Sequence, residues 1–515
     1  MNGKSKLKRK TKLAVSLVLL VSFLFTGSGF GSPLQDPDAP SVPYKIFLPY
    51  IFTSGGPTGG GGDPDPRPVR NIFGVETSYI DSNLVSKADG VNANWWRYFA
   101  FSWKGIEPTD VSPSQYNWSA VYEHHLRDAA AGGFSIVATV KFSPFWAQAM
   151  SDSQSVQCSP IKDDAATIAD FQEFLTALVN RYKEPPFNIK IWQFWNEPDL
   201  DPDVLVAIGQ LYTSPFGCWG DDTDPYYGGE KYGKFLSIFG QTVKAADPQA
   251  KITNGGMLLD CNPEENPTGC IMGKFFEGTL RGLIANNGAQ YLDYVSFHVY
   301  GHWYANLNLD ENYGGFRDGG VMLGKAKFLR KKMADYGIDP VKPLIMTEAG
   351  LMCKRPDTAL ELPSRKKCSD TVAPPEFEDD QAEYIVWIYV RAIANDISGV
   401  MWYMLNYQSY RHVGLMYGDF ITPKPAYLAY QYLVSQLYDA YYVRTLDEYF
   451  PTLRAYEFTK NGHPIWVMWA PDQTNHAITL PAGFQNAYDK FGNQISVAPG
   501  ATSIDINGPT YLILN

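Results

Sequence analysis

Basic residues are scarce in this chain of 515 residues, with 43 Lys and Arg against 54 Asp and Glu. Six of them lie within the first twelve positions, so the rest of the chain holds 37 and carries a net charge of −17. An acidic surface of this kind is poorly suited to nucleic acid or to an anionic membrane. We therefore expect neither as a partner, and an uncharged polymer fits better as a ligand.

The N-terminus lacks an apolar run long enough to cross a bilayer. A basic stretch, 4–12, precedes an apolar run, 13–25, of about 13 residues, whereas a spanning helix needs roughly 20. Small residues follow at 27–32, and this order is typical of a secretory signal peptide. We expect residues 1–32 to be cleaved and the protein to be secreted, with no membrane contact beyond export. An uncleaved N-terminal anchor is the alternative.

Cysteine is rare, and none of its spacings is the C-x-x-C of a zinc site. Export makes disulfides the expected state of these thiols, with free or metal-bound thiols as the alternative. Sequence alone does not choose the pairing. Proximity in the sequence favours Cys261–Cys270 and Cys353–Cys368, which leaves Cys158–Cys218.

No glycine-rich phosphate loop follows the first expected strand, which argues against nucleotide binding. Short β-rich runs instead alternate with amphipathic helical stretches from residue 71 onward. Eight strands, most of them followed by a helix, predict an α/β fold, a (β/α)8 TIM barrel over residues 71–438. A doubly wound open sheet is the structural alternative, but it rarely shows eight regular repeats. The expected strands are 71–76, 94–99, 135–141, 189–195, 251–255, 292–298, 343–348 and 399–405.

The segments on either side of the barrel lack this alternation. Residues 33–70 are rich in Pro, Gly and Asp, so we expect a linker that buries little. Residues 439–515 show short alternating strands separated by turn signals such as Asn461-Gly462. They predict a small C-terminal β-sandwich that packs on the barrel rather than carrying chemistry.

Two glutamates stand at the ends of expected barrel strands. Glu197 directly follows an apolar run in the segment WNEP (195–198), and Glu348 ends a strand three strand–helix units later. The C-terminal ends of the strands form the face at which TIM-barrel enzymes hold their active sites. An isolated Glu at such a position is more simply a helix cap or an ion-pair partner. Two of them at one barrel mouth indicate a joint catalytic site.

Two carboxyl groups across a barrel mouth suit the hydrolysis of glycosidic bonds. One must be protonated to assist the leaving group, and the other ionised to attack the anomeric carbon. At the ~5–5.5 Å separation of retaining enzymes, their repulsion is roughly 3 kcal/mol at an effective dielectric of about 20, or about two pKa units. This predicts Glu197 as an acid/base whose pKa is raised to about 6, Glu348 as the nucleophile, and a mildly acidic pH optimum.

The residues around both glutamates resemble glycoside hydrolase clan A over about residues 71–438. Asn196-Glu197 after the fourth strand and Glu348 after the seventh look like the signature of that clan. The segment WRY (96–98) is similar to its second strand, FSPFW (142–146) to the end of its third, and SFHVY (296–300) to its sixth. The resemblance implies a TIM-barrel enzyme that acts on oligo- or polysaccharides.

The resemblance also implies roles for the polar neighbours. Asn196 would hydrogen-bond the substrate 2-hydroxyl, a contact that strengthens in the transition state. Arg97 would keep the nucleophile Glu348 ionised by charge pairing, and Tyr300 would hydrogen-bond the same carboxylate. The simpler alternative for Arg97 is a salt bridge at the barrel mouth without a catalytic role.

Three further residues are implied in binding or support. His298 would contact the substrate or orient the acid/base, unless it is a structural histidine. Trp402, at the end of the eighth strand, would form an apolar floor under the sugar ring, unless it belongs to the core. Trp146, at the end of the third, would bind or support the substrate. No metal or organic cofactor is expected, since the two carboxylates suffice.

The family within the clan stays open. The loop after Trp103, Asp247-Pro248 and the terminal β-sandwich resemble family 39, which includes β-xylosidases, whereas TEAG (347–350) resembles family 5 equally well. We expect action on β-linked plant-polysaccharide fragments, as by a β-xylosidase. An endo-β-glucanase or mannanase is the alternative within the clan, and a non-catalytic glycan-binding protein on a degenerate barrel is the alternative from another class. The oligomeric state is not predicted.

Overall fold

The computed structural model describes residues 67–68, 72–149, 159–200, 217, 219–259, 273–303, 321–338, 340–353, 368, 373–406 and 410–515. The expected signal peptide, 1–32, and most of the expected linker lie outside the described residues. So do four of the six cysteines, namely Cys158, Cys218, Cys261 and Cys270.

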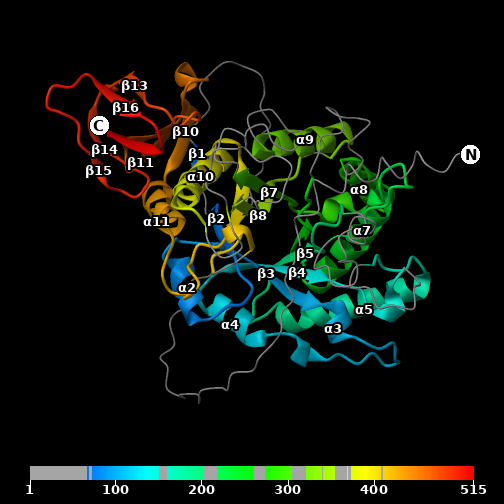
Figure 1. Cartoon of the computed structure of the whole chain (residues 1–515). Helices are drawn as coiled ribbons and strands as arrows, with labels where there is room; N and C mark the ends of the chain where they lie inside the picture. The colour runs from blue at the N-terminus through cyan, green and yellow to red at the C-terminus, as the bar shows by residue number, and fades with distance from the viewer. Residues whose placement is uncertain are drawn as a thin grey trace, which may run out of the picture.

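Eight parallel strands form the expected barrel (Figure 1). Neighbouring strands follow the order β6-β5-β4-β3-β2-β9-β8-β7. Single bridges join Thr253 to Tyr294 and Met257 to Phe297, and so close the gap between β6 and β7. The strands are β2 (Phe73–Glu76), β3 (Trp95–Ser102), β4 (Ser135–Lys141), β5 (Ile191–Phe194), β6 (Lys251–Asn254), β7 (Val295–Trp303), β8 (Leu344–Cys353) and β9 (Ile397–Trp402).

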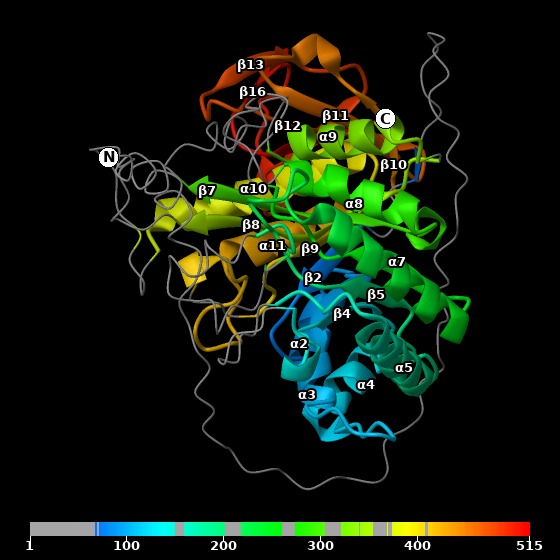
Figure 2. The same ribbon diagram turned by 90° about the vertical axis from the view of Figure 1, so that its right-hand side faces the viewer.

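Helices surround the strands, as the quarter-turned view shows (Figure 2). Their apolar faces recur at helical spacing; in α5, for example, Phe171, Leu175 and Leu178 are buried. No helix of the described residues is long and apolar enough to span a membrane. The α-helices are α2 (Ser82–Asp89), α3 (Trp103–Ile106), α4 (Glu123–Ala131), α5 (Ala165–Tyr182), α7 (Gly229–Ala246), α8 (Lys274–Ala285), α9 (Val321–Asp335), α10 (Pro375–Ala394) and α11 (Pro425–Leu437). Short 3-10 turns are η1 (Trp118–Ala120), η2 (Phe145–Ala147), η3 (Ala289–Tyr291), η5 (Tyr410–His412) and η6 (Asp447–Tyr449).

The C-terminal region consists of two antiparallel sheets. One has seven strands in the order β1-β10-β11-β12-β17-β14-β15, and the other pairs β13 with β16. Its first strand, β1, comes from the end of the segment expected to be a linker, so that segment contributes an edge strand to this sheet. The strands are β1 (Arg67–Pro68), β10 (Tyr441–Thr445), β11 (Arg454–Lys460), β12 (His463–Trp469), β13 (His476–Thr479), β14 (Phe484–Tyr488), β15 (Gln494–Ile495), β16 (Ser503–Ile506) and β17 (Thr510–Leu514).

Aromatic contacts join the larger sheet to the last two barrel helices. Trp387 of α10 stacks on Trp469 of β12 with 5.6 Å between ring centroids, and Tyr432 of α11 meets the edge of Tyr511 of β17 at 5.0 Å. Stacked and edge-to-face geometries are favourable beyond the area that they bury. The C-terminal sheets therefore pack against α10 and α11, on one side of the barrel (Figure 1).

Candidate active site

Glu348 lies inside β8 rather than at its end, because this strand continues to Cys353. The register of β8 against β9 shifts between Met346 and Ala349, and an irregularity of this kind redirects a side chain at a barrel rim. Both carboxylate oxygens have donors: Arg97 Nη1 lies 2.5 Å from Oε1, and the Tyr300 hydroxyl donates to Oε2. These are the two contacts that the sequence predicted for Glu348.

Arg97, on β3, is fully buried among acceptors. Besides Glu348 its guanidinium donates to Glu76 Oε2 at 2.9 Å, to Gln193 Oε1 at 2.7 Å and to Asn196 Oδ1 at 2.5 Å. Burial opposes the charged form, but Glu76 and Glu348 outweigh burial and raise the pKa of Arg97. The cation is thus permanent and fixed beside Glu348.

Glu197 follows β5 in a left-handed backbone conformation, with φ of 43°. This conformation is uncommon for a residue other than glycine and persists only where the surroundings hold it. The Glu197 N–H donates to the Gly256 carbonyl at 3.1 Å, and the carboxylate Oε1 lies 2.8 Å from His298 Nδ1. Burial, then Arg97 and Lys325, lower the pKa of His298 well below its usual range, so the imidazole is neutral.

The two glutamates are brought together from strands distant in the sequence. One oxygen of Glu197, one oxygen of Glu348 and a ring nitrogen of His298 all lie within 4.8 Å of one another. Such a group could in principle hold a metal ion, but the Arg97 guanidinium already supplies the positive charge at Glu348. The arrangement offers two carboxyl groups in different environments, one against a fixed cation and one against a neutral imidazole.

Trp402 does not form the floor of the site, and this expectation is wrong. Its side chain is 0% exposed, its indole N–H donates to the Val413 carbonyl, and its ring meets Tyr384 of α10. Side chains alternate along a strand, so Trp402 faces the helices and the next residue turns inward. Tyr403 packs edge-on against Tyr300 at 5.9 Å. Of these two adjacent aromatic residues, Tyr403 and not Trp402 lies beside Tyr300.

Trp146 lies on the 3-10 turn η2 beyond β4. Its ring packs edge-on against the buried Trp103 at 5.4 Å, and its indole N–H reaches the Glu107 carbonyl at 3.4 Å. These contacts support the loop after β3. They place Trp146 beside that loop, and none of them reaches Glu197 or Glu348.

Two charged residues of the site were missed in the sequence. Glu76 ends β2, and burial raises its pKa to about 8, with Arg97 opposing and Glu348 reinforcing the shift. Lys141 ends β4 with its ammonium 3.4 Å from the centroid of Phe99, and burial followed by Arg97 lowers its pKa to about 7. A charged residue that ends an apolar strand run is the signal that could have revealed both.

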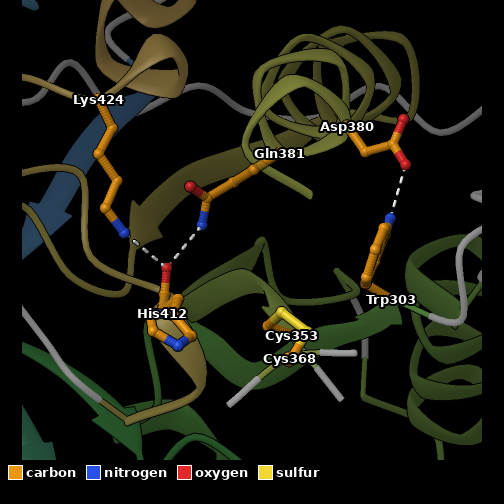
Figure 3. The surroundings of a disulfide bond; sticks show 7 residues. All are labelled: Trp303, Cys353, Cys368, Asp380, Gln381, His412 and Lys424. Carbon is orange, nitrogen blue, oxygen red and sulfur yellow. Dashed lines mark hydrogen bonds between the residues drawn. A yellow bond between two sulfur atoms is a disulfide. The ribbon is translucent and has the colours of Figure 1, made fainter. Parts of the chain in front are cut away.

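A disulfide closes the far end of β8 (Figure 3). Cys353 and Cys368 are bonded, 15 residues apart, which confirms the pairing favoured by proximity. In the same region Trp303 of β7 donates to Asp380 of α10 at 2.6 Å. The bond and this contact anchor the ends of β7 and β8 beyond His298 and Glu348.

No protein-family model and no curated protein sequence matches the chain. Solved structures do match its fold. A family 39 glycoside hydrolase from the gut symbiont Bacteroides cellulosilyticus WH2 has a TM-score of 0.60 at 17% identity, over 87% of this chain and 81% of that one. The chain has the fold of glycoside hydrolases.

Two further structures carry the same likeness. A GH39 β-xylosidase from Caulobacter crescentus has a TM-score of 0.53 at 13% identity, over 87% of this chain and 97% of that one. The family 30 subfamily 8 xylanase Xyn30A from Clostridium acetobutylicum has a TM-score of 0.50 at 13% identity, over 87% and 97%. The fold is therefore shared between two families of glycoside hydrolases.

Proposed function

We propose that this chain is a secreted retaining glycoside hydrolase of clan A, with Glu197 as acid/base and Glu348 as nucleophile. The observation that carries the proposal is the approach of one oxygen from each carboxyl group to within 4.8 Å. Retaining enzymes hold the two groups about 5–5.5 Å apart, whereas inverting enzymes leave about 6.5–9.5 Å for a water molecule. The shorter separation supports direct attack by one carboxylate.

The surroundings assign the two roles. Glu348, held by the Arg97 cation and the Tyr300 hydroxyl, is oriented for attack on the anomeric carbon. Glu197, beside the neutral His298, gives its proton to the leaving oxygen. In the second half of the reaction Glu197 takes a proton from water, which displaces Glu348 from the sugar.

Asn196 has its side-chain orientation fixed by Arg97. Because Asn196 Oδ1 accepts from the guanidinium, its amide nitrogen is the group left to donate to a sugar hydroxyl. A donor beside the nucleophile suits the 2-hydroxyl, whose hydrogen bond strengthens in the transition state. Tyr300 and Tyr403 add an aromatic wall on which a sugar ring packs in place of the floor first assigned to Trp402.

The substrate proposal rests on the proteins that share this fold. Among the proteins with this fold, two are called a β-xylosidase and a xylanase, which favours β-linked plant-polysaccharide fragments over the endo-glucanase or mannanase alternative.

The two C-terminal sheets share an apolar core that includes Ile478, Ile504 and Leu512. We infer a small β-sandwich there that braces the barrel.

A panel of aryl β-glycosides, with proton NMR of the first-formed anomer, tests the proposal. Glu348→Gly is expected to abolish turnover while sugar binding persists, because removing a nucleophile leaves the binding contacts in place. Glu383→Gln is the matched control, since Glu383 is another buried glutamate but faces Lys490 of the C-terminal region. An inverted first product, or turnover that survives Glu348→Gly, would refute the assignment. Sugar binding with no turnover by the wild type would favour the glycan-binding alternative.

A further inference from the structure

The segment 256–259 lies between the two groups that hold the proton in the proposed reaction. It directly follows β6, and its Gly256 carbonyl accepts from the Glu197 N–H at 3.1 Å. On its other side the Met257 carbonyl accepts from the His298 N–H at 2.8 Å. The segment thus sets how far the backbone of the acid/base stands from the backbone of its imidazole partner.

Gly256 allows this close passage. A Cβ on this residue would lie 2.0 Å from His298 Nε2 and 2.4 Å from Thr347 Oγ1, well inside van der Waals contact. The imidazole therefore lies directly against the backbone of the segment. A shift of the segment moves both Glu197 and His298.

Asp199 holds the segment from one side. It is 0% exposed, and its two carboxylate oxygens accept from consecutive backbone N–H groups, Leu258 at 3.0 Å and Leu259 at 2.8 Å. Leu259 has φ of 48°, a conformation that needs such support. Because Asp199 lies two residues after Glu197, it ties the segment to the same short stretch of chain that carries the acid/base.

Lys325 holds the segment from the other side. This buried lysine of α9 donates to the Leu258 carbonyl at 2.5 Å and to the His298 carbonyl at 3.0 Å. Hydrogen bonds from a charged group are stronger than those between neutral groups. Asp199 and Lys325 thus bind the N–H and the carbonyl of the same residue, Leu258, and lock its peptide groups between them.

We propose that Asp199 and Lys325 are positioning residues that fix the acid/base Glu197 against its partner His298 by clamping the segment 256–259. Neither touches the reacting atoms; both act through Gly256 and Met257. The inference rests on the proposed function, because it specifies how the acid/base of that reaction is held. Proton donation is sensitive to placement, and a displacement of about 1 Å can cost about a hundredfold in rate.

Leaving-group dependence separates a positioning role from a structural one. An aryl group that leaves readily needs no proton from Glu197, whereas a poor leaving group does. Asp199→Asn keeps the size of the side chain but replaces one acceptor by a donor facing a backbone N–H. We expect kcat/KM for the phenyl glycoside to fall about tenfold or more relative to that for the 2,4-dinitrophenyl glycoside.

Asp293→Asn is the matched control. Asp293 also accepts from a backbone N–H, that of Ile252 at 2.9 Å, and pairs with Lys244, but it lies before β7, at the opposite end of the barrel. Both variants lose a carboxylate that accepts from the backbone, Asp199 fully buried and Asp293 partly buried, so both are expected to have a lowered Tm. A steeper leaving-group dependence is expected in Asp199→Asn alone.

Lys325→Met is an independent test, because it removes the contact of α9 with the segment. It can be measured even if Asp199→Asn does not fold. Azide, which needs no general base, should accelerate turnover of both clamp variants and not of Asp293→Asn. Equal leaving-group dependence in the clamp variants and the control would overturn the inference while leaving the proposed function intact. A wild type that hydrolyses no aryl glycoside would instead overturn the proposed function.

Discussion

Replacing Arg97 by Met tests how much the buried guanidinium contributes to stability and to turnover. Met has a similar length and no charge, so the change removes the guanidinium with little loss of apolar packing. Four acceptors lose a donor, and two of them, Glu76 and Glu348, are carboxylates buried to 1% and 5% exposure. Above about pH 8, where Glu76 is ionised, the variant leaves two buried carboxylates without their cation.

The expected losses of stability and of turnover follow from the removal of this cation. Removing one partner of a buried ion pair costs about 3–5 kcal/mol, because the remaining charge is left without compensation. The loss of a hydrogen bond to a charged group at the nucleophile costs about 1.5–3 kcal/mol, which is roughly a tenfold to hundredfold fall in kcat. We therefore expect Arg97→Met to lose both stability and turnover, with KM less affected.

A double-mutant cycle with Glu76→Gln isolates the charge effect. Glu76→Gln still accepts from Arg97 but removes one of the two stranded carboxylates from the Arg97→Met background. The double variant should therefore be more stable than Arg97→Met alone, by about 1–2 kcal/mol on the scale of coupling energies. Urea unfolding of the four proteins at one pH above 8, where Glu76 is ionised in the wild type, measures this coupling.

The pH dependence of the free energy of unfolding in the same series is an independent test. The pKa of Glu76 is raised from 4.5 to about 8, so its protonation favours the folded state. This stability is fully present below pH 4.5 and is lost as the pH rises to about 8. The stability of the wild type relative to Glu76→Gln should fall between pH 5 and 7. A loss below about 1 kcal/mol in Arg97→Met, or no recovery in the double variant, would refute the reasoning.

Three further changes test other parts of the site. Tyr300→Phe removes the hydroxyl that donates to Glu348; kcat should fall about tenfold with KM little changed in steady-state assays, and an unchanged kcat would contradict the contact. Gly256→Ala introduces a Cβ 2.0 Å from the His298 ring, so thermal unfolding should show a lower Tm and activity should fall. A variant with the Tm and activity of the wild type would contradict this close contact between the backbone and the imidazole. Replacing Cys353 and Cys368 by Ser opens a loop of 15 residues, which should cost about 3 kcal/mol in urea unfolding, and no loss would argue against the disulfide.

The local pattern of the chain was enough to predict the barrel. Each strand is a run of apolar residues between helices whose buried faces recur every three to four positions, and these periods can be counted without coordinates. The bounds were less certain. β7 and β8 continue five residues beyond their expected ends, to Trp303 and Cys353, because the two strands stay paired after the register shift between Phe297 and His298.

The two glutamates were also predictable from their positions in the sequence, and their first partners from the resemblance to clan A. A strand-end carboxylate in a barrel faces the mouth, and this rule applied to Glu197 and Glu348 needs only their positions. The same rule applied to Glu76 and Lys141 would have revealed them too. Their burial, and with it their shifted pKa values, depends on which side chains crowd around Arg97.

Only the tertiary structure decided which way Trp402 faces and how Glu197 is held. Trp402 contacts Tyr384 of α10 whereas Tyr403 contacts Tyr300, and the sequence alone does not say which of two adjacent aromatic residues at a strand end faces the helices. The clamp on 256–259 joins residues 59 and 67 positions apart. Sequence determined which chemistry the chain carries, because that depends on residue types at strand ends. Folding decided the distances, because these depend on contacts between segments remote along the chain.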